Sequence, residues 1–199
     1  MRRRRGYTLL EALISVAIMA VVASLGIPPL LEAAARHELD LAARDVVMTL
    51  RLARSYAIRH TAHVAVRFES GAQGTVTFAL FRDGDGDGVL THDIESGVDP
   101  QAAPPRPLAH FGRRARLGFP PGMQPRDPGD PRRRLDRLDD PIRFQSSGLA
   151  SFSPFGGSTP GSIYLTDGKR GLVVVRVYNR TGHIEVLRYD ASREVWIPD

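Results

Sequence analysis

A stretch of twenty residues without a single charge, residues 12–31, constrains this chain more than any other feature. It is rich in Ala, Val, Ile and Leu, and as a helix it is long enough to cross the roughly 30 Å hydrocarbon core of a bilayer. Arginines occupy residues 2–5, directly before it, and positively charged flanks stay on the cytoplasmic side of a membrane. The sequence therefore predicts one membrane-spanning helix, with the N-terminus in the cytoplasm and everything after residue 31 outside.

A cleaved secretory signal is the competing interpretation, because a basic segment followed by an apolar segment is typical of both. Twenty uncharged residues exceed the usual length of the apolar part of a signal, and the helical pattern continues after residue 31. These two observations favour a permanent anchor.

The rest of the chain has an ordinary globular composition, with 42% hydrophobic and 25% charged residues among 199. One further domain is therefore expected. The formal net charge of +5 falls to +1 when residues 1–6 and their four arginines are removed, so the charge does not indicate nucleic-acid binding. The absence of Cys excludes disulfides, thiolate metal sites and cysteine nucleophiles.

Glu11 lies at the cytoplasmic edge of the apolar stretch, where a carboxylate costs a few kcal/mol if it enters hydrocarbon unpaired. Such a residue is either a functional charge or an interfacial Glu that reaches water. Its surroundings favour a function, because the string GYTLLE at residues 6–11, between arginines and an apolar helix, resembles the class III leader of type IV pilins and type II secretion pseudopilins.

This resemblance implies roles for three residues. A prepilin peptidase would cleave after Gly6 and methylate the new N-terminal amine of Tyr7, which stands where the family more commonly has Phe. Glu11 would pair with the methylated amine of a neighbouring subunit. Because buried opposite charges stabilise one another only in good geometry, such a pair would set the register between subunits.

An amphipathic helix is predicted to follow the apolar segment. Gly26, Pro28 and Pro29 should interrupt and kink the helix near its outer end. Beyond them, apolar residues recur at spacings of four and three and form one stripe, consisting of Leu39, Ala43, Val46, Leu50, Ala53 and Ala57. This half should pack its stripe on the domain outside the membrane and end near Arg59.

Short strands dominate the remainder. Strict alternation of apolar and polar residues predicts a strand at residues 63–69, and further strands are expected at residues 75–81, 142–145, 149–153, 162–166, 172–178, 183–188 and 194–197. The proline-rich interruption at residues 83–140 should be mostly loop, and its arginine runs at 113–116 and 132–134 should be solvated. A long helix followed by strands predicts an α+β fold, with the helix covering one face of an antiparallel sheet.

Four segments follow from these patterns. They are a leader peptide (1–6), the transmembrane half of the helix (7–31), its amphipathic half (32–60) and a β-rich periplasmic domain (61–199) that contains the long loop 83–140.

Three carboxylates in that loop, those of Asp83, Asp85 and Asp87, stand two residues apart and precede a Gly, as in the first half of an EF-hand calcium loop. The twelfth position, where an EF-hand has a bidentate Glu, is Ile94, although Asp93 and Glu95 flank it. Either a shifted ligand closes a calcium site or the segment is an acidic turn. No other cofactor is expected.

The layout of the chain looks like the GspH and FimT branch of the pilin superfamily, the minor pseudopilins and minor pilins. This resemblance rests on the leader, the Asp–Gly loop after the second strand, and the run at 152–156 before an apolar strand. It implies a structural subunit near the tip of a type II secretion pseudopilus or type IV pilus. Its partners would be other pilins or pseudopilins and prepilin peptidase, and its place the inner membrane with a periplasmic domain.

Two alternatives remain. FimT-like proteins bind DNA for transformation through a Gly-Arg-x-Arg motif near the C-terminus, but residues 182–185 read GHIE here, so both arginines are missing and nucleic-acid binding is not expected. A membrane-anchored periplasmic enzyme is the second alternative. No nucleophile elbow, zinc-binding helix pair or phosphate loop is present in the sequence, so no catalytic residue is assigned.

Overall fold

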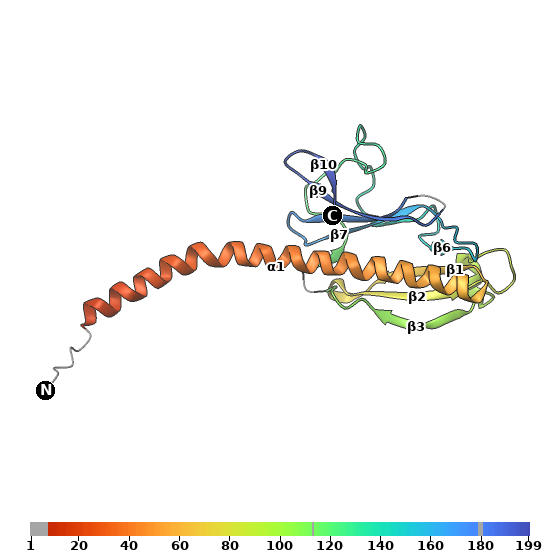
Figure 1. Ribbon diagram of the computed structural model, residues 1–199, viewed down its shortest axis with the longest axis horizontal. Coiled ribbons are helices and arrows are strands. Elements are labelled where there is room, and N and C mark those ends of the chain that lie inside the picture. The colour runs from red at the N-terminus through yellow and green to blue at the C-terminus, as the bar shows by residue number, and fades with distance from the viewer. Residues whose placement is uncertain (1–7, 113, 179–180) are drawn as a thin grey trace.

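The computed structural model describes residues 8–112, 114–178 and 181–199, and one long helix extends far beyond the folded domain (Figure 1). This helix, α1, spans Leu9–His60. Thr8 caps its start, and Thr61, in the left-handed conformation, ends it by donating its N–H to the carbonyls of Ala57 and Ile58. The predicted end near residue 59 is confirmed.

The prolines do not interrupt α1. The helix runs through Pro28 and Pro29 without a break, and Figure 1 shows a curve along its projecting half. A proline removes one hydrogen bond and crowds the carbonyl four residues earlier, and a helix that is free to bend accommodates both. The expected interruption is therefore wrong, and the axis curves instead.

Two antiparallel sheets form the rest of the molecule. The first has the order β3-β2-β1-β6 and is built from β1 (Val64–Ser70), β2 (Val76–Arg82), β3 (Gln101–Pro107) and β6 (Ala150–Phe152). The second has the order β10-β9-β8-β7-β4, with β5 also paired to β7. Its strands are β4 (Arg116–Leu117), β5 (Ile142–Arg143), β7 (Gly161–Thr166), β8 (Leu172–Val177), β9 (Ile184–Asp190) and β10 (Val195–Pro198). The α+β fold class is confirmed.

The core lies between both sheets and the second half of α1. All six residues of the predicted stripe are buried, and Ala42 and Thr49 are buried beside them. The apolar residues among them share one cluster with Val66 of β1 and Val175 of β8, so α1 packs against both sheets. Burying each Leu, Val or Phe side chain of this cluster contributes about 1.5–3 kcal/mol, and the cluster holds most of the buried apolar residues described, so it is the main source of stability for the domain.

The interruption at residues 83–140 contains more structure than its prolines suggest. It holds the short helix α2 (Thr91–Ser96), the edge strand β3 and the two-residue strand β4. β3 includes three prolines, which an edge strand tolerates because one side of it needs no hydrogen bonds. Its register against β2 also shifts between Phe78 and Phe81.

Candidate functional site

The projecting half of α1 presents apolar side chains to its surroundings. This half contains an 18-residue window apolar enough to cross a membrane, and none of that window is buried. Leu9, Leu25 and Leu30, for example, are 80%, 74% and 69% exposed. Because a soluble surface rarely exposes so large an apolar area, this segment requires lipid or other helices around it.

Glu11 stands in the first turn of this apolar segment. Its backbone N–H donates to Oγ1 of Thr8 (3.3 Å), and its carbonyl accepts from the hydroxyl of Ser15 (2.8 Å). Among the described residues, none pairs with its carboxylate, which is left free to meet a cation from another chain. Gly6 and Tyr7, the predicted cleavage and methylation residues, lie outside the described residues.

The second half of α1 has two distinct faces. Leu50 is fully buried against the sheets, whereas Met48, Leu52 and Ile58 are 66%, 46% and 50% exposed. These three exposed residues form a separate apolar patch near the end of α1, beyond the continuous apolar surface that ends at Leu31.

The Asp–Gly loop, which we define as residues 83–99, brings the three predicted carboxylates together. Oxygen atoms of Asp83, Asp85 and Asp87 lie within 4.8 Å of one another. Asp83 organises the turn: its Oδ1 accepts the N–H of Asp85 (3.2 Å) and Gly86 (2.6 Å), and its Oδ2 accepts that of Gly88 (3.0 Å). Gly88 has a φ of +105°, which suits glycine and explains the residue type at the sharp turn.

Asp99 fixes the base of this loop. It is buried, and its two oxygens accept the N–H of Gly84 (3.0 Å) and of Leu90 (2.9 Å). Gly84 also passes so close to Val98 that an added Cβ would lie 1.9 Å from the carbonyl oxygen of Val98. Sequence reasoning missed Asp99, because nothing in the pattern distinguishes it from the other acids of the segment.

Asp93 is a second buried acid of the loop. It is only 6% exposed, and its Oδ1 lies 3.1 Å from Nε2 of His92, while its Oδ2 has no hydrogen-bond partner in the part of the chain that the structure describes. Partial desolvation raises the pKa of Asp87, and the charges of Asp85, Asp93 and Asp83 raise it further. Asp93 therefore acts on the same cluster from α2.

Ile94, at the twelfth position of the motif, is not available as a ligand. It packs, partly buried, against an apolar cluster that includes Ala65 and Phe81. The register of α2 thus places Ile94 toward the sheet and makes Asp93 the buried carboxylate of α2 itself.

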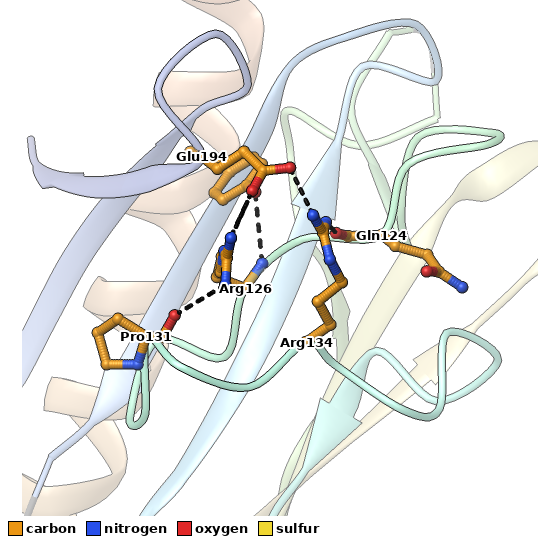
Figure 2. Close-up of polar contacts among 6 residues, drawn as sticks. Gln124, Arg126, Pro131, Arg134 and Glu194 are labelled. Atoms are coloured by element: carbon orange, nitrogen blue, oxygen red, sulfur yellow. Dashed lines mark hydrogen bonds and ion pairs between the residues drawn. The ribbon is translucent and has the colours of Figure 1, made fainter.

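A second polar cluster joins the long loop to the turn between β9 and β10 (Figure 2). Arg126 donates to Oε2 of Glu194 from Nε (3.2 Å) and Nη2 (2.7 Å), and Arg134 donates to Oε1 from Nη2 (2.6 Å). The guanidinium groups also donate to the carbonyls of Gln124 (2.7 Å) and Pro131 (3.4 Å). Hydrogen bonds from Arg134 and Arg126 lower the pKa of Glu194, so its carboxylate ties two distant segments together.

Other arginines are paired within the fold as well. Arg114 lies 3.8 Å from Glu38, Arg143 lies 3.9 Å from Asp136, and Arg188 pairs with Asp40 and with Asp199 (3.1 Å). These ion pairs occupy guanidinium groups that a nucleic-acid-binding surface would need to contact phosphates. Arg134 belongs to the second arginine run, and its acid is Glu194, not one of the aspartates nearby in sequence.

The comparisons with known proteins agree with this architecture. Residues 1–27 match the model of the prokaryotic N-terminal methylation motif, and residues 42–182 match the model of the type II transport protein GspH. Among curated proteins and solved structures, none matches the chain. The GspH match spans well over half of the 199 residues, including residues 42–60 of α1 and most strands of both sheets. The chain therefore belongs to the GspH family of type II transport proteins, the pilin-like minor pseudopilins, whose role is structural.

Proposed function

We propose that this chain is a subunit of a type II secretion pseudopilus or type IV pilus, that it assembles through α1, and that it lies near the filament tip. The observation that carries the proposal is the apolar half of α1, which is exposed along its length and has Glu11 in its first turn, with no cation among the described residues paired to its carboxylate. Before assembly, this half is held in the inner membrane with the β-rich domain in the periplasm, as the preceding arginines favour.

Processing is the first step of the proposed function. Prepilin peptidase cleaves after Gly6 and methylates Tyr7, and other pilins or pseudopilins then receive the mature chain. The match of residues 1–27 to the methylation motif supports this step. The position of Thr8 also supports it, because the helix cap directly follows the new N-terminal residue.

Glu11 then sets the register of the subunit. A carboxylate in an apolar surround costs a few kcal/mol when unpaired, and the positive amine of a neighbouring subunit removes that cost at one axial position only. Glu11 therefore favours one alignment of adjacent helices over all others.

The test is the pair of variants Glu11→Leu and Glu32→Leu, expressed in a strain that lacks the native gene. Both remove a carboxylate from α1, but Glu32 is exposed beyond the apolar segment, 3.6 Å from Arg36. We expect both variants in the membrane fraction in normal amounts. Glu11→Leu should fail to cross-link to other subunits and to restore secretion or piliation, whereas Glu32→Leu should do both. Normal cross-linking and complementation by Glu11→Leu would make Glu11 an ordinary interfacial residue.

The tip position has its own test. Gold-labelled antibodies against the β-rich domain should mark filament ends. Labelling along the whole filament would instead indicate a major subunit.

A further inference from the structure

We propose that three cations, Arg116, Lys169 and Arg170, rest on the anionic lipid headgroups of the membrane that holds α1. These residues, the proximal cations, lie at the end of the β-rich domain from which α1 projects. The inference rests on the proposed membrane anchoring of α1, and it adds a second contact with the membrane that the folded domain itself makes.

Two separate segments bring the proximal cations together. β4 pairs with β7 so that Arg116 stands opposite Thr166, the last residue of β7. The guanidinium of Arg116 lies over the turn that joins β7 to β8, so close to Gly168 that an added Cβ would be 2.8 Å from its Nη2. Lys169 and Arg170 follow Gly168 directly, and all three cations are exposed. Three positive groups therefore share one small surface.

The fold leaves these positive groups available to an external anion. Among the residues that the structure describes, no carboxylate forms an ion pair with any of the proximal cations. Asp167 belongs to the same turn, but its Oδ1 accepts the N–H groups of Lys169 (2.8 Å), Arg170 (3.0 Å) and Gly171 (2.9 Å). Nearby acids of α1 have other partners: Glu38 pairs with Arg114, Asp40 with Arg188 and Asp45 with His110.

The level of the turn along α1 points to the membrane as the source of that anion. Gly171 ends the turn, and a Cβ added to it would lie 3.0 Å from Cδ2 of Leu39. Leu39 is the first buried residue of α1, and Figure 1 shows the earlier part of the helix projecting from the domain. The uncharged segment ends at residue 31, so at 1.5 Å per residue the turn lies about 12 Å beyond the hydrocarbon.

Headgroups fill about half of that distance. A bilayer of about 40–45 Å around a core of about 30 Å has about 5–7 Å of headgroup layer on each side. The remaining gap of about 5–7 Å is shorter than the Debye length of about 8 Å at physiological salt, and Lys and Arg side chains are long enough to cross much of it. Each cation near an anionic membrane surface favours the docked state about fivefold, so the three together favour it on the order of a hundredfold.

Other exposed cations of α1 are too far from the membrane for this contact. Arg51 and Arg59 are exposed on the second half of the helix. They lie about 30 Å and about 42 Å beyond residue 31, several Debye lengths from the headgroups. The proximal cations therefore give the domain one preferred orientation on the bilayer before assembly.

The experiment measures the distance between domain and lipid in nanodiscs that each hold one copy of the full-length protein. The chain has no Cys, so Ala72→Cys can carry a single donor fluorophore, with an acceptor on the lipid headgroups. Ala72 is exposed in the turn between β1 and β2, and Gly74 of that turn lies beside Arg116. Energy transfer should be higher in nanodiscs rich in phosphatidylglycerol than in phosphatidylcholine nanodiscs, and high salt should abolish the difference. A donor at Ser96→Cys on α2, beyond the other end of β2, should show no such rise.

The decisive variant is Lys169→Gln combined with Arg170→Gln. It changes two exposed side chains of the turn and should reduce the ratio of docked to free domain about 25-fold, which removes most of the rise in energy transfer. Adding Arg116→Gln should remove the rest. The matched control is Arg51→Gln combined with Arg59→Gln, which removes the same charge far from the membrane and should keep the wild-type response.

Three results would overturn the proposal. The first is equal energy transfer in the two lipids, and the second is a rise that Lys169→Gln with Arg170→Gln retains in full. The third is a rise that occurs only when a nanodisc holds two or more copies, which would assign the proximal cations to contact between subunits. A chain that does not insert into nanodiscs would overturn the membrane anchoring as well, whereas insertion without a response to lipid charge would overturn the docking alone.

Discussion

Replacing Leu50 by Ala tests whether the second half of α1 is an integral part of the folded domain. Leu50 is fully buried in the cluster that joins α1 to both sheets. Leu-to-Ala changes in such cores cost about 2–5 kcal/mol through lost burial and the cavity that remains. Leu and Ala are both good helix formers, so the loss reports packing and not helix propensity.

For a chain of this size, 1 kcal/mol shifts Tm by about 2–4 °C, so a loss of about 3 kcal/mol lowers Tm by about 6–12 °C. The assay is thermal unfolding of the full-length protein in detergent, followed by the fluorescence of Trp196, the only tryptophan, whose indole N–H donates to the carbonyl of Arg126 (2.7 Å). The control is Leu52→Ala, whose side chain is 46% exposed and whose loss should shift Tm by less than about 3 °C. Equal shifts for the two variants would refute the packing of α1 described here.

Two further predictions concern charged groups of the β-rich domain. Glu194→Gln should lower Tm near pH 7, and this loss of Tm should become smaller below about pH 5. The pKa of Glu194 is lowered in the folded state from its ordinary value of 4.5. The stabilisation by its carboxylate is therefore complete above pH 4.5 and disappears as the pH falls through the folded pKa. A difference in Tm between wild type and Glu194→Gln that does not change with pH would contradict the ion pairs of Glu194 with Arg134 and Arg126. For DNA, we expect the mature protein to bind labelled duplex no tighter than about 10⁻⁴ to 10⁻⁶ M at physiological salt, and His183→Arg combined with Glu185→Arg to strengthen binding in fluorescence anisotropy. Nanomolar binding by the wild type with a steep salt dependence would instead favour a function in DNA uptake.

The sequence predicted those elements whose periodicity survives in the fold. The stripe on α1 and the strands β1, β2, β7, β8 and β9 were found because alternation and helical spacing reflect burial directly. β3 was missed because its three prolines are typical of loops, and only its position at the edge of a sheet makes them acceptable. The passage of α1 through Pro28 and Pro29 depends on freedom to bend, which a local pattern does not reveal.

The residues of the candidate sites could likewise be predicted only where they are close together in the sequence. Asp83, Asp85 and Asp87 were predicted because they are neighbours in sequence. The hydrogen bonds by which Asp99 holds the base of the Asp–Gly loop were not predicted. The contact between Arg126 and Glu194, which are 68 residues apart, was not predicted either. Such contacts are set by topology, so spacing along the chain carries no signal for them.

The mature N-terminus tests the central claim most directly. Full-length protein should be purified from cells that contain prepilin peptidase and from matched cells that lack it, and both samples analysed by intact and peptide mass spectrometry. The assembly role predicts a chain that begins at N-methylated Tyr7 in the first sample and retains residues 1–6 in the second. An intact Met1 in the presence of the peptidase, or cleavage after Ser24 as in a secretory signal, would contradict it.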